Sequence, residues 1–214
     1  MPAYFNRFYS LCSTSPARRA AGRIAPLALM AWLAGCAVLP APTADSQNAW
    51  TARQQELMRL TRWQAAGRIG VVNGQDGWHA NFQWAQREQD YRIDLIGPLG
   101  QGRVLIEGDD RQVSIQTQDG QSQTASDPDS LLEQAIGVRL PVEGLRYWIR
   151  GVPEPGPVAA SQTDRNGRLL RLEQQGWIIE YPDYAPASPT LLPARIVARR
   201  QDLSVKLVID RWTL

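Results

Sequence analysis

The sequence has 214 residues, with 23 basic side chains, 21 acidic side chains and one histidine. Four of the basic residues lie in residues 1–35, which contain no acid. The rest of the chain therefore has 19 basic and 21 acidic residues and a net charge of −2. A chain with this balance has no cationic field for nucleic acid, and a single histidine excludes a metal site built on several.

The first 36 residues predict a bacterial export signal that ends in a lipid attachment site. Four arginines precede an apolar run at residues 24–34, which is much shorter than the roughly 20 residues that cross a bilayer. The run ends in Leu33-Ala34-Gly35-Cys36, which resembles the lipobox of bacterial lipoproteins. That resemblance implies that residues 1–35 are removed and that Cys36 receives a thioether-linked diacylglycerol and an N-acyl chain. An ordinary secretory signal with an incidental cysteine is the alternative.

Residues 36–48 are expected to form a lipidated tether, because proline and small polar residues do not build a core. Attachment by several acyl chains is stable where attachment by one is marginal. In Gram-negative lipoproteins an aspartate after the lipidated cysteine often signals inner-membrane retention. Ala37 therefore predicts an outer-membrane lipoprotein that faces the periplasm.

Residues 49–214 are predicted to form one domain that starts with a helix over 49–61. From Trp63 onwards, apolar residues recur at every second position, the period of a half-buried strand. The predicted strands lie at residues 68–71, 78–84, 91–95, 104–106, 113–117, 170–173, 177–181, 195–199 and 203–210. This alternation indicates an antiparallel meander with one wet and one dry face, and roughly nine to eleven strands.

Two further helices are expected between the two runs of strands. Ser126-Asp127-Pro128-Asp129 combines a capping side chain, a proline in the first turn and an acid near the positive end of the helix dipole. Gly137 can end this helix, and a second short helix follows Pro141. A sheet of so many strands tends to curl, and the helices can pack inside the curl. The predicted fold class is therefore mostly β with α (α+β), a curved antiparallel sheet with a three-helix lid or plug.

No catalytic chemistry is indicated. His79 lies on the polar side of an alternating strand, where a solvated position is a better interpretation than a catalytic base. The acid pair Asp109-Asp110 lies in a turn, where aspartate is favoured for local hydrogen bonding. We therefore expect no enzyme and no cofactor beyond the acyl groups on Cys36. A hydrolase that uses only carboxylates is the weakest alternative.

Several segments along the chain carry a resemblance to a known family. They are Trp63-Gln64-Ala65-Ala66-Gly67-Arg68, Asn81-Phe82-Gln83-Trp84, Leu95-Ile96-Gly97-Pro98-Leu99-Gly100, Leu145-Arg146-Tyr147-Trp148-Ile149-Arg150-Gly151-Val152-Pro153, Gly176-Trp177 with Tyr181, and Trp212-Thr213-Leu214. With the lipobox, their order and spacing resemble the LolB family of outer-membrane lipoprotein receptors. The resemblance implies an unclosed eleven-stranded barrel with a helical lid. Its apolar cavity would hold the acyl chains of lipoproteins handed over by a soluble LolA-like carrier. A monomer is expected.

Two groups of residues are candidates for this function. The dry face of the sheet and the second short helix supply the candidate cavity lining, although ordinary core is the default interpretation. These residues are Phe82, Trp84, Ile93, Leu95, Val113, Ile115, Trp148, Ile149, Trp177 and Ile179. Leu99, between Pro98 and Gly100, is the candidate membrane-insertion loop. The resemblance implies a functional leucine there, whereas a leucine in a turn is more often a core residue or one of the scattered exposed ones.

Two alternatives share these sequence features. The first is a lipid or glycolipid shuttle on the same fold, which would have the cavity but no protein carrier. The second is a structural or interaction lipoprotein with a solid core, which docks an envelope complex through an edge of its sheet.

Overall fold

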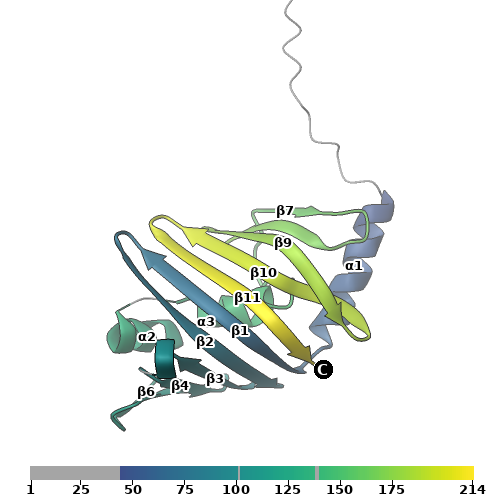
Figure 1. Ribbon diagram of the computed structural model, residues 1–214. Helices are drawn as coiled ribbons and strands as arrows, with labels where there is room; N and C mark the ends of the chain where they lie inside the picture. The colour runs from purple at the N-terminus through teal and green to yellow at the C-terminus, as the bar shows by residue number, and fades with distance from the viewer. Residues whose placement is uncertain (1–43, 101, 138–139) are drawn as a thin grey trace, which may run out of the picture. The chain divides into compact units, whose positions relative to one another are not determined.

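A computed structural model describes residues 44–100, 102–137 and 140–214 (Figure 1). Within these ranges the chain forms three α-helices, one short 3-10 helix and eleven strands. The helices are α1 (Ala44–Met58), η1 (Pro98–Gly100), α2 (Pro128–Ile136) and α3 (Val142–Trp148). The strands are β1 (Arg62–Asn73), β2 (Asp76–Arg87), β3 (Asp90–Ile96), β4 (Val104–Gly108), β5 (Val113–Thr117), β6 (Ser122–Ala125), β7 (Ala160–Thr163), β8 (Leu169–Gln174), β9 (Trp177–Ala187), β10 (Thr190–Arg200) and β11 (Leu203–Thr213).

All eleven strands belong to one antiparallel sheet in the order β6-β5-β4-β3-β2-β1-β11-β10-β9-β8-β7. The chain runs outwards from β1 to β6, passes through α2 and α3, and runs back from β7 to β11, which pairs with β1. The sheet is therefore unclosed, with β6 and β7 as its two edges, and it curves around α3 (Figure 1). The predicted fold class is confirmed.

The alternation in the sequence becomes the concave, buried face of this sheet. One row of paired inward residues runs across five strands, from Ala65 in β1 through Trp84, Ile93 and Ile106 to Ile115 in β5. Each of these side chains is at most 6% exposed. Because successive strand residues point to opposite faces, this register also places the charged residues between them on the convex face.

The helix α2 starts and ends as the sequence predicts. Asp127 is the N-cap, and its carboxylate accepts a hydrogen bond from the backbone N–H of Asp129, while Pro128 occupies the first turn. Gly137 ends the helix with a φ of 75°, and its N–H donates to the carbonyl of Glu133. By contrast, α1 starts at Ala44, earlier than the predicted position 49. Among the residues that the structure describes, no helix is long and apolar enough to cross a membrane.

Two strands, β6 and β7, are absent from the predicted set. Both are four residues long, and three of the four side chains in each are exposed. They are the edges of the sheet, where only one side of the backbone is paired and neither face demands an apolar pattern. The apolar alternation that indicates a strand is therefore missing from the two edge strands.

The phase of β8 is also corrected by the structure. The sequence pattern places Leu170 and Leu172 on one face, but Leu169 and Leu172 are buried while Leu170 is 48% exposed. The pairing with β7 explains this, because Gln162 pairs with Arg171 whereas the next residue, Thr163, pairs with Leu169. This bulge skips Leu170 and turns it outwards.

A second bulge lies at the centre of the sheet and depends on a glycine. The pairing of β1 with β11 shifts between Ala66 and Gly67, and a Cβ at Gly67 would lie 2.0 Å from the carbonyl oxygen of Val208. We predict that Gly67→Ala lowers the free energy of unfolding by about 1–3 kcal/mol, because the two backbones must separate. Urea denaturation measures this.

Gly70→Ala in the same strand is the matched control. A Cβ at Gly70 meets nothing within 4 Å, so this variant should be unchanged or more stable by up to about 1 kcal/mol. Equal stability of the two variants would show that the close approach at Gly67 does not constrain the sheet.

Candidate functional site

The concave face brings together all ten residues predicted to line a cavity. They come from β2, β3, β5, α3 and β9, and they all belong to one apolar cluster in which none of them is more than 6% exposed. The structure therefore confirms that they share one surface. In the state described, that surface is packed with side chains.

Helix α3 supplies the side chains that fill the centre of the concave face. Trp148 and Ile149 are fully buried, and the ring centroids of Trp148 and Trp177 are 5.9 Å apart. The indole Nε1 of Trp148 donates to Oε1 of Gln174 at 3.1 Å, and Gln174 in turn donates from Nε2 to the carbonyl of Glu154. The Trp148 indole and the Gln174 amide are therefore both hydrogen-bonded, as buried polar groups require.

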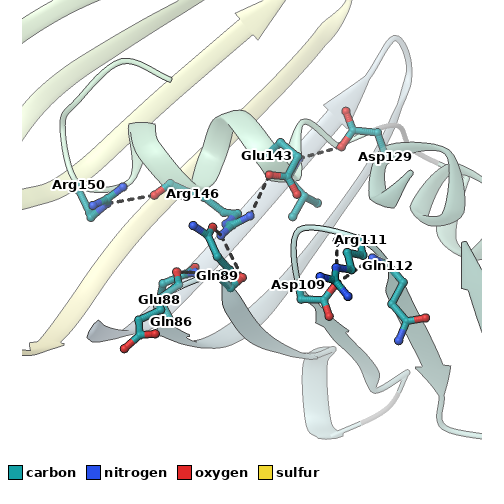
Figure 2. A network of polar contacts seen from close by, with 11 residues as sticks. Gln86, Glu88, Gln89, Asp109, Arg111, Gln112, Asp129, Glu143, Arg146 and Arg150 are labelled. Carbon is teal, nitrogen blue, oxygen red and sulfur yellow. Dashed lines mark hydrogen bonds and ion pairs between the residues drawn. The ribbon is translucent and has the colours of Figure 1, made fainter. Parts of the chain in front are cut away.

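Two buried arginines, one in the last turn of α3 and one just after it, tie this helix to neighbouring elements (Figure 2). Arg150 donates from Nη1 to the carbonyls of Leu57 and Leu60, both at 2.9 Å, which ties α3 to the end of α1. Arg146 pairs with Glu143 at 2.9 Å and donates from Nη2 to the carbonyl of Gln89 at 3.0 Å, which ties α3 to the β2–β3 turn. Burial lowers the pKa of Arg150 to about 10.

The sequence analysis did not identify these two arginines as functional candidates. Arg146 and Arg150 are one helical turn apart and flank the fully buried Trp148 and Ile149. Their position in an apolar segment was the signal that could have identified them. A buried arginine needs hydrogen-bond acceptors, and where no acid lies beside it, as at Arg150, backbone carbonyls must supply them.

The loop between β3 and β4 presents Leu99 to solvent. Its side chain is 98% exposed, far more than any other large apolar side chain in the described chain. Leu99 has a φ of 58° and Gly100 a φ of 78°, and the N–H of Gly100 donates to the carbonyl of Gly97. This left-handed turn is so tight that the Leu99 side chain cannot fold back onto the sheet.

The residues that follow this loop are hydrogen-bonded to the turn between β5 and β6. The backbone N–H groups of Gly102 and Arg103 both donate to Oε1 of Gln118, at 2.7 and 3.3 Å. Leu99 therefore protrudes from a held loop, as predicted. Cys36, the predicted lipid attachment site, lies outside the described residues.

Comparison with known proteins agrees with this geometry. The family model described as outer membrane lipoprotein LolB matches residues 61–212. The chain belongs to the LolB family. An outer-membrane lipoprotein LolB of Nitrosococcus oceani is 40% identical over 185 residues, covering 85% of this chain and 92% of that protein. The protein of the same name from Pseudomonas aeruginosa is 39% identical over 188 residues, covering 86% and 91%.

Among solved structures, a LolA superfamily protein from Nitrosomonas europaea is similar over 79% of this chain and 93% of that chain, with a TM-score of 0.49 and 9% sequence identity. Family membership rests on the sequence relatives. It confirms the predicted location, the outer membrane, and the predicted role as a lipoprotein receptor of the LolB family.

Buried tyrosines give the fold a predictable response to alkali. Burial raises the pKa of Tyr91, Tyr181 and Tyr184 above the ordinary value of 10. Above pH 10 the unfolded chain loses phenolic protons that the folded chain retains, so the free energy of unfolding falls as pH rises. Arg150 acts in the opposite direction, because its lowered pKa makes the free energy of unfolding rise with pH above about pH 10, but it is one group against three.

We predict that the urea midpoint is lower at pH 11 than at pH 9, and that Tyr181→Phe reduces this difference. Tyr181 is fully buried, and its phenylalanine variant has no proton to lose. Urea titrations of both proteins at the two pH values test this. An unchanged difference in the variant would contradict the assignment.

Proposed function

We propose that the concave face takes up the acyl chains of lipoproteins delivered by a LolA-like carrier, and that the Leu99 loop assists their insertion into the outer membrane. The observation that carries the proposal is the combination of one continuous apolar face, covered by a separate short helix, with one almost fully exposed leucine at a tight turn.

Uptake requires space that the described state fills with side chains. Trp148 and Ile149 occupy the centre of the concave face, so acyl chains enter when α3 moves away from it. The sheet itself does not have to change, because α3 is held by side-chain contacts of Arg146 and Arg150 rather than by strand pairing. Cargo binding and α3 docking then compete for one surface.

Transfer needs no chemical step, because burial alone gives it a direction. Each methylene removed from water contributes about 0.8 kcal/mol. A small advantage per methylene over the carrier, summed along several chains, is sufficient for acyl chains to move from carrier to receptor. The burial of methylenes in the bilayer favours the departure of the acyl chains from the receptor in the same way.

Leu99 acts on the last step. Burying one leucine contributes about 1.5–3 kcal/mol, which is too little to anchor a protein but enough to bias a loop towards a bilayer already nearby. In this proposal Cys36 carries the acyl groups that hold the chain at the membrane, Pro98 and Gly100 hold Leu99 at the tip, and the receptor works as a monomer.

The interaction-lipoprotein alternative has one observation in its favour, which is the filled concave face. A solid core would bind no acyl chains, and edge strands such as β7 would then be the functional surface. A transfer experiment separates the two proposals, because only the receptor takes cargo from a carrier.

We predict that the mature chain with Cys36→Ala, mixed with carrier loaded with a lipoprotein, acquires the lipoprotein in a pull-down and releases it when liposomes are added. Leu99→Glu should still acquire the cargo but release at least tenfold less of it, since a carboxylate does not enter the bilayer. Sedimentation of liposomes with labelled cargo measures release.

Leu170→Glu is the matched control, because Leu170 is an exposed leucine on β8, away from the loop. It should acquire and release cargo like the parent chain. Failure of the folded parent chain to acquire any cargo would refute the receptor mechanism and favour the interaction lipoprotein. Equal loss of release in the two glutamate variants would refute the specific role of Leu99.

A further inference from the structure

Four buried polar atoms without partners belong to residues on neighbouring strand positions at one end of the concave face. They are Nε1 of Trp63, Nε1 of Trp84, Oε1 of Gln86 and the hydroxyl of Tyr91, and none has a hydrogen-bond partner among the described residues. Their side chains are between 2% and 5% exposed. The three other unpartnered side-chain atoms found in the described chain, on Arg53, Trp78 and Tyr181, lie apart from these four.

The strand register makes the four residues neighbours. Trp63, Gln86 and Tyr91 are paired directly across β1, β2 and β3, and Trp84 lies on the next inward row. The ring centroids of Trp63 and Trp84 are 5.5 Å apart. We call these four residues the polar cluster. They lie near the β2–β3 turn, which Arg146 joins to α3 (Figure 2).

The surroundings of Tyr91 are arranged around its hydroxyl. The guanidinium of Arg146 lies 5.0 Å from the centre of the Tyr91 ring. On the neighbouring strand, a Cβ at Gly108 would lie 2.5 Å from the hydroxyl oxygen. A glycine is therefore required beside this hydroxyl, and Arg146 of α3 lies over the Tyr91 ring.

A buried polar atom without a partner is unfavourable, and native proteins contain few of them. Four such atoms on neighbouring positions of three strands, in a protein that pairs the indole of Trp148 and the hydroxyl of Tyr184 elsewhere, indicate groups that bind something else. Three of the four are donors, one is an acceptor, and the concave face is otherwise mostly apolar. The matching ligand is apolar but carries several carbonyl oxygens and one N–H.

We propose that the polar cluster binds the head of the cargo's acylated cysteine, with the N–H and O–H groups of Trp63, Trp84 and Tyr91 donating to its carbonyl oxygens. Gln86 accepts from its amide N–H. A diacylglyceryl, N-acylated cysteine has two ester carbonyls, one amide carbonyl and one amide N–H where its chains meet. The cluster then sets how deep the chains lie. This inference rests on the proposed function and adds to it the place where the head of the lipid binds.

The test compares two synthetic probes on the full mature chain with Cys36→Ala. One is a short peptide with a diacylglyceryl, N-acylated cysteine. The other has the same chain lengths but ether links in place of the two esters, so it lacks two carbonyl oxygens. We expect the parent chain to bind the ester probe several-fold more tightly, measured by displacement of a fluorescent fatty acid.

Tyr91→Phe removes one unpartnered oxygen and nothing else. We expect it to weaken the ester probe about threefold to tenfold, the range of one net hydrogen bond, and to leave the ether probe unchanged. Trp84→Phe should act in the same direction. Because the lost hydroxyl has no partner in the unliganded fold, the urea midpoint of Tyr91→Phe should stay the same or rise, which a structural role would not produce.

Tyr181→Phe is the matched control, because its hydroxyl is equally buried and unpartnered but lies on β9 outside the polar cluster. It should leave the preference for the ester probe intact. Equal binding of the two probes, or equal weakening of both in Tyr91→Phe, would overturn the inference while the proposed function stands. Binding of neither probe to the folded parent chain would overturn both.

A diacyl phospholipid of the same chain length forms a third arm, because it offers two ester carbonyls but no amide. We expect it to bind less tightly than the acylated cysteine, and Gln86→Met to remove part of that difference. Equal binding of phospholipid and acylated cysteine would overturn the assignment to a lipoprotein head and assign the cluster to diacylglyceryl lipids in general.

Discussion

A sheet that curls without closing needs another element to cover its concave face. Here the eleven strands end in two unpaired edges, β6 and β7, and an apolar face lies between them. The helix α3 covers this face, with Trp148 and Ile149 fully buried. In the proposed mechanism, the position of α3 therefore determines whether the concave face is a core or a binding surface.

The way in which α3 is attached suits both states. Its inner side is apolar, as a core requires, but its C-terminal part is held by arginines that donate to backbone carbonyls of Leu57, Leu60 and Gln89. Hydrogen bonds of this kind contribute only modestly to stability, because water replaces them when they open. The strand pairing of the sheet does not involve these contacts, so in the proposed mechanism α3 leaves while the sheet keeps its register.

Sequence periodicity identifies the concave face because burial on one side of a strand imposes a period of two. The eight predicted lining residues that lie on strands are buried together for that reason, and the cap of α2 follows from Asp127 and Pro128. Periodicity fails where burial does not act, at the exposed edges β6 and β7 and at the bulge that turns Leu170 outwards. It is also silent about Arg146 and Arg150, whose partners are backbone carbonyls far away in the sequence.

A filled face and a binding face differ in their polar atoms rather than in their apolar ones. Trp148 and Trp212 each bury an indole N–H against an oxygen, on Gln174 and on the carbonyl of Pro193. Trp63 and Trp84 bury the same group without a partner. Trp63 lies in the same strand row as the equally unpartnered Tyr91, and Trp84 lies in the next inward row. In the proposed complex these open groups cost stability only in the empty fold, because a ligand with carbonyl oxygens removes that cost on binding.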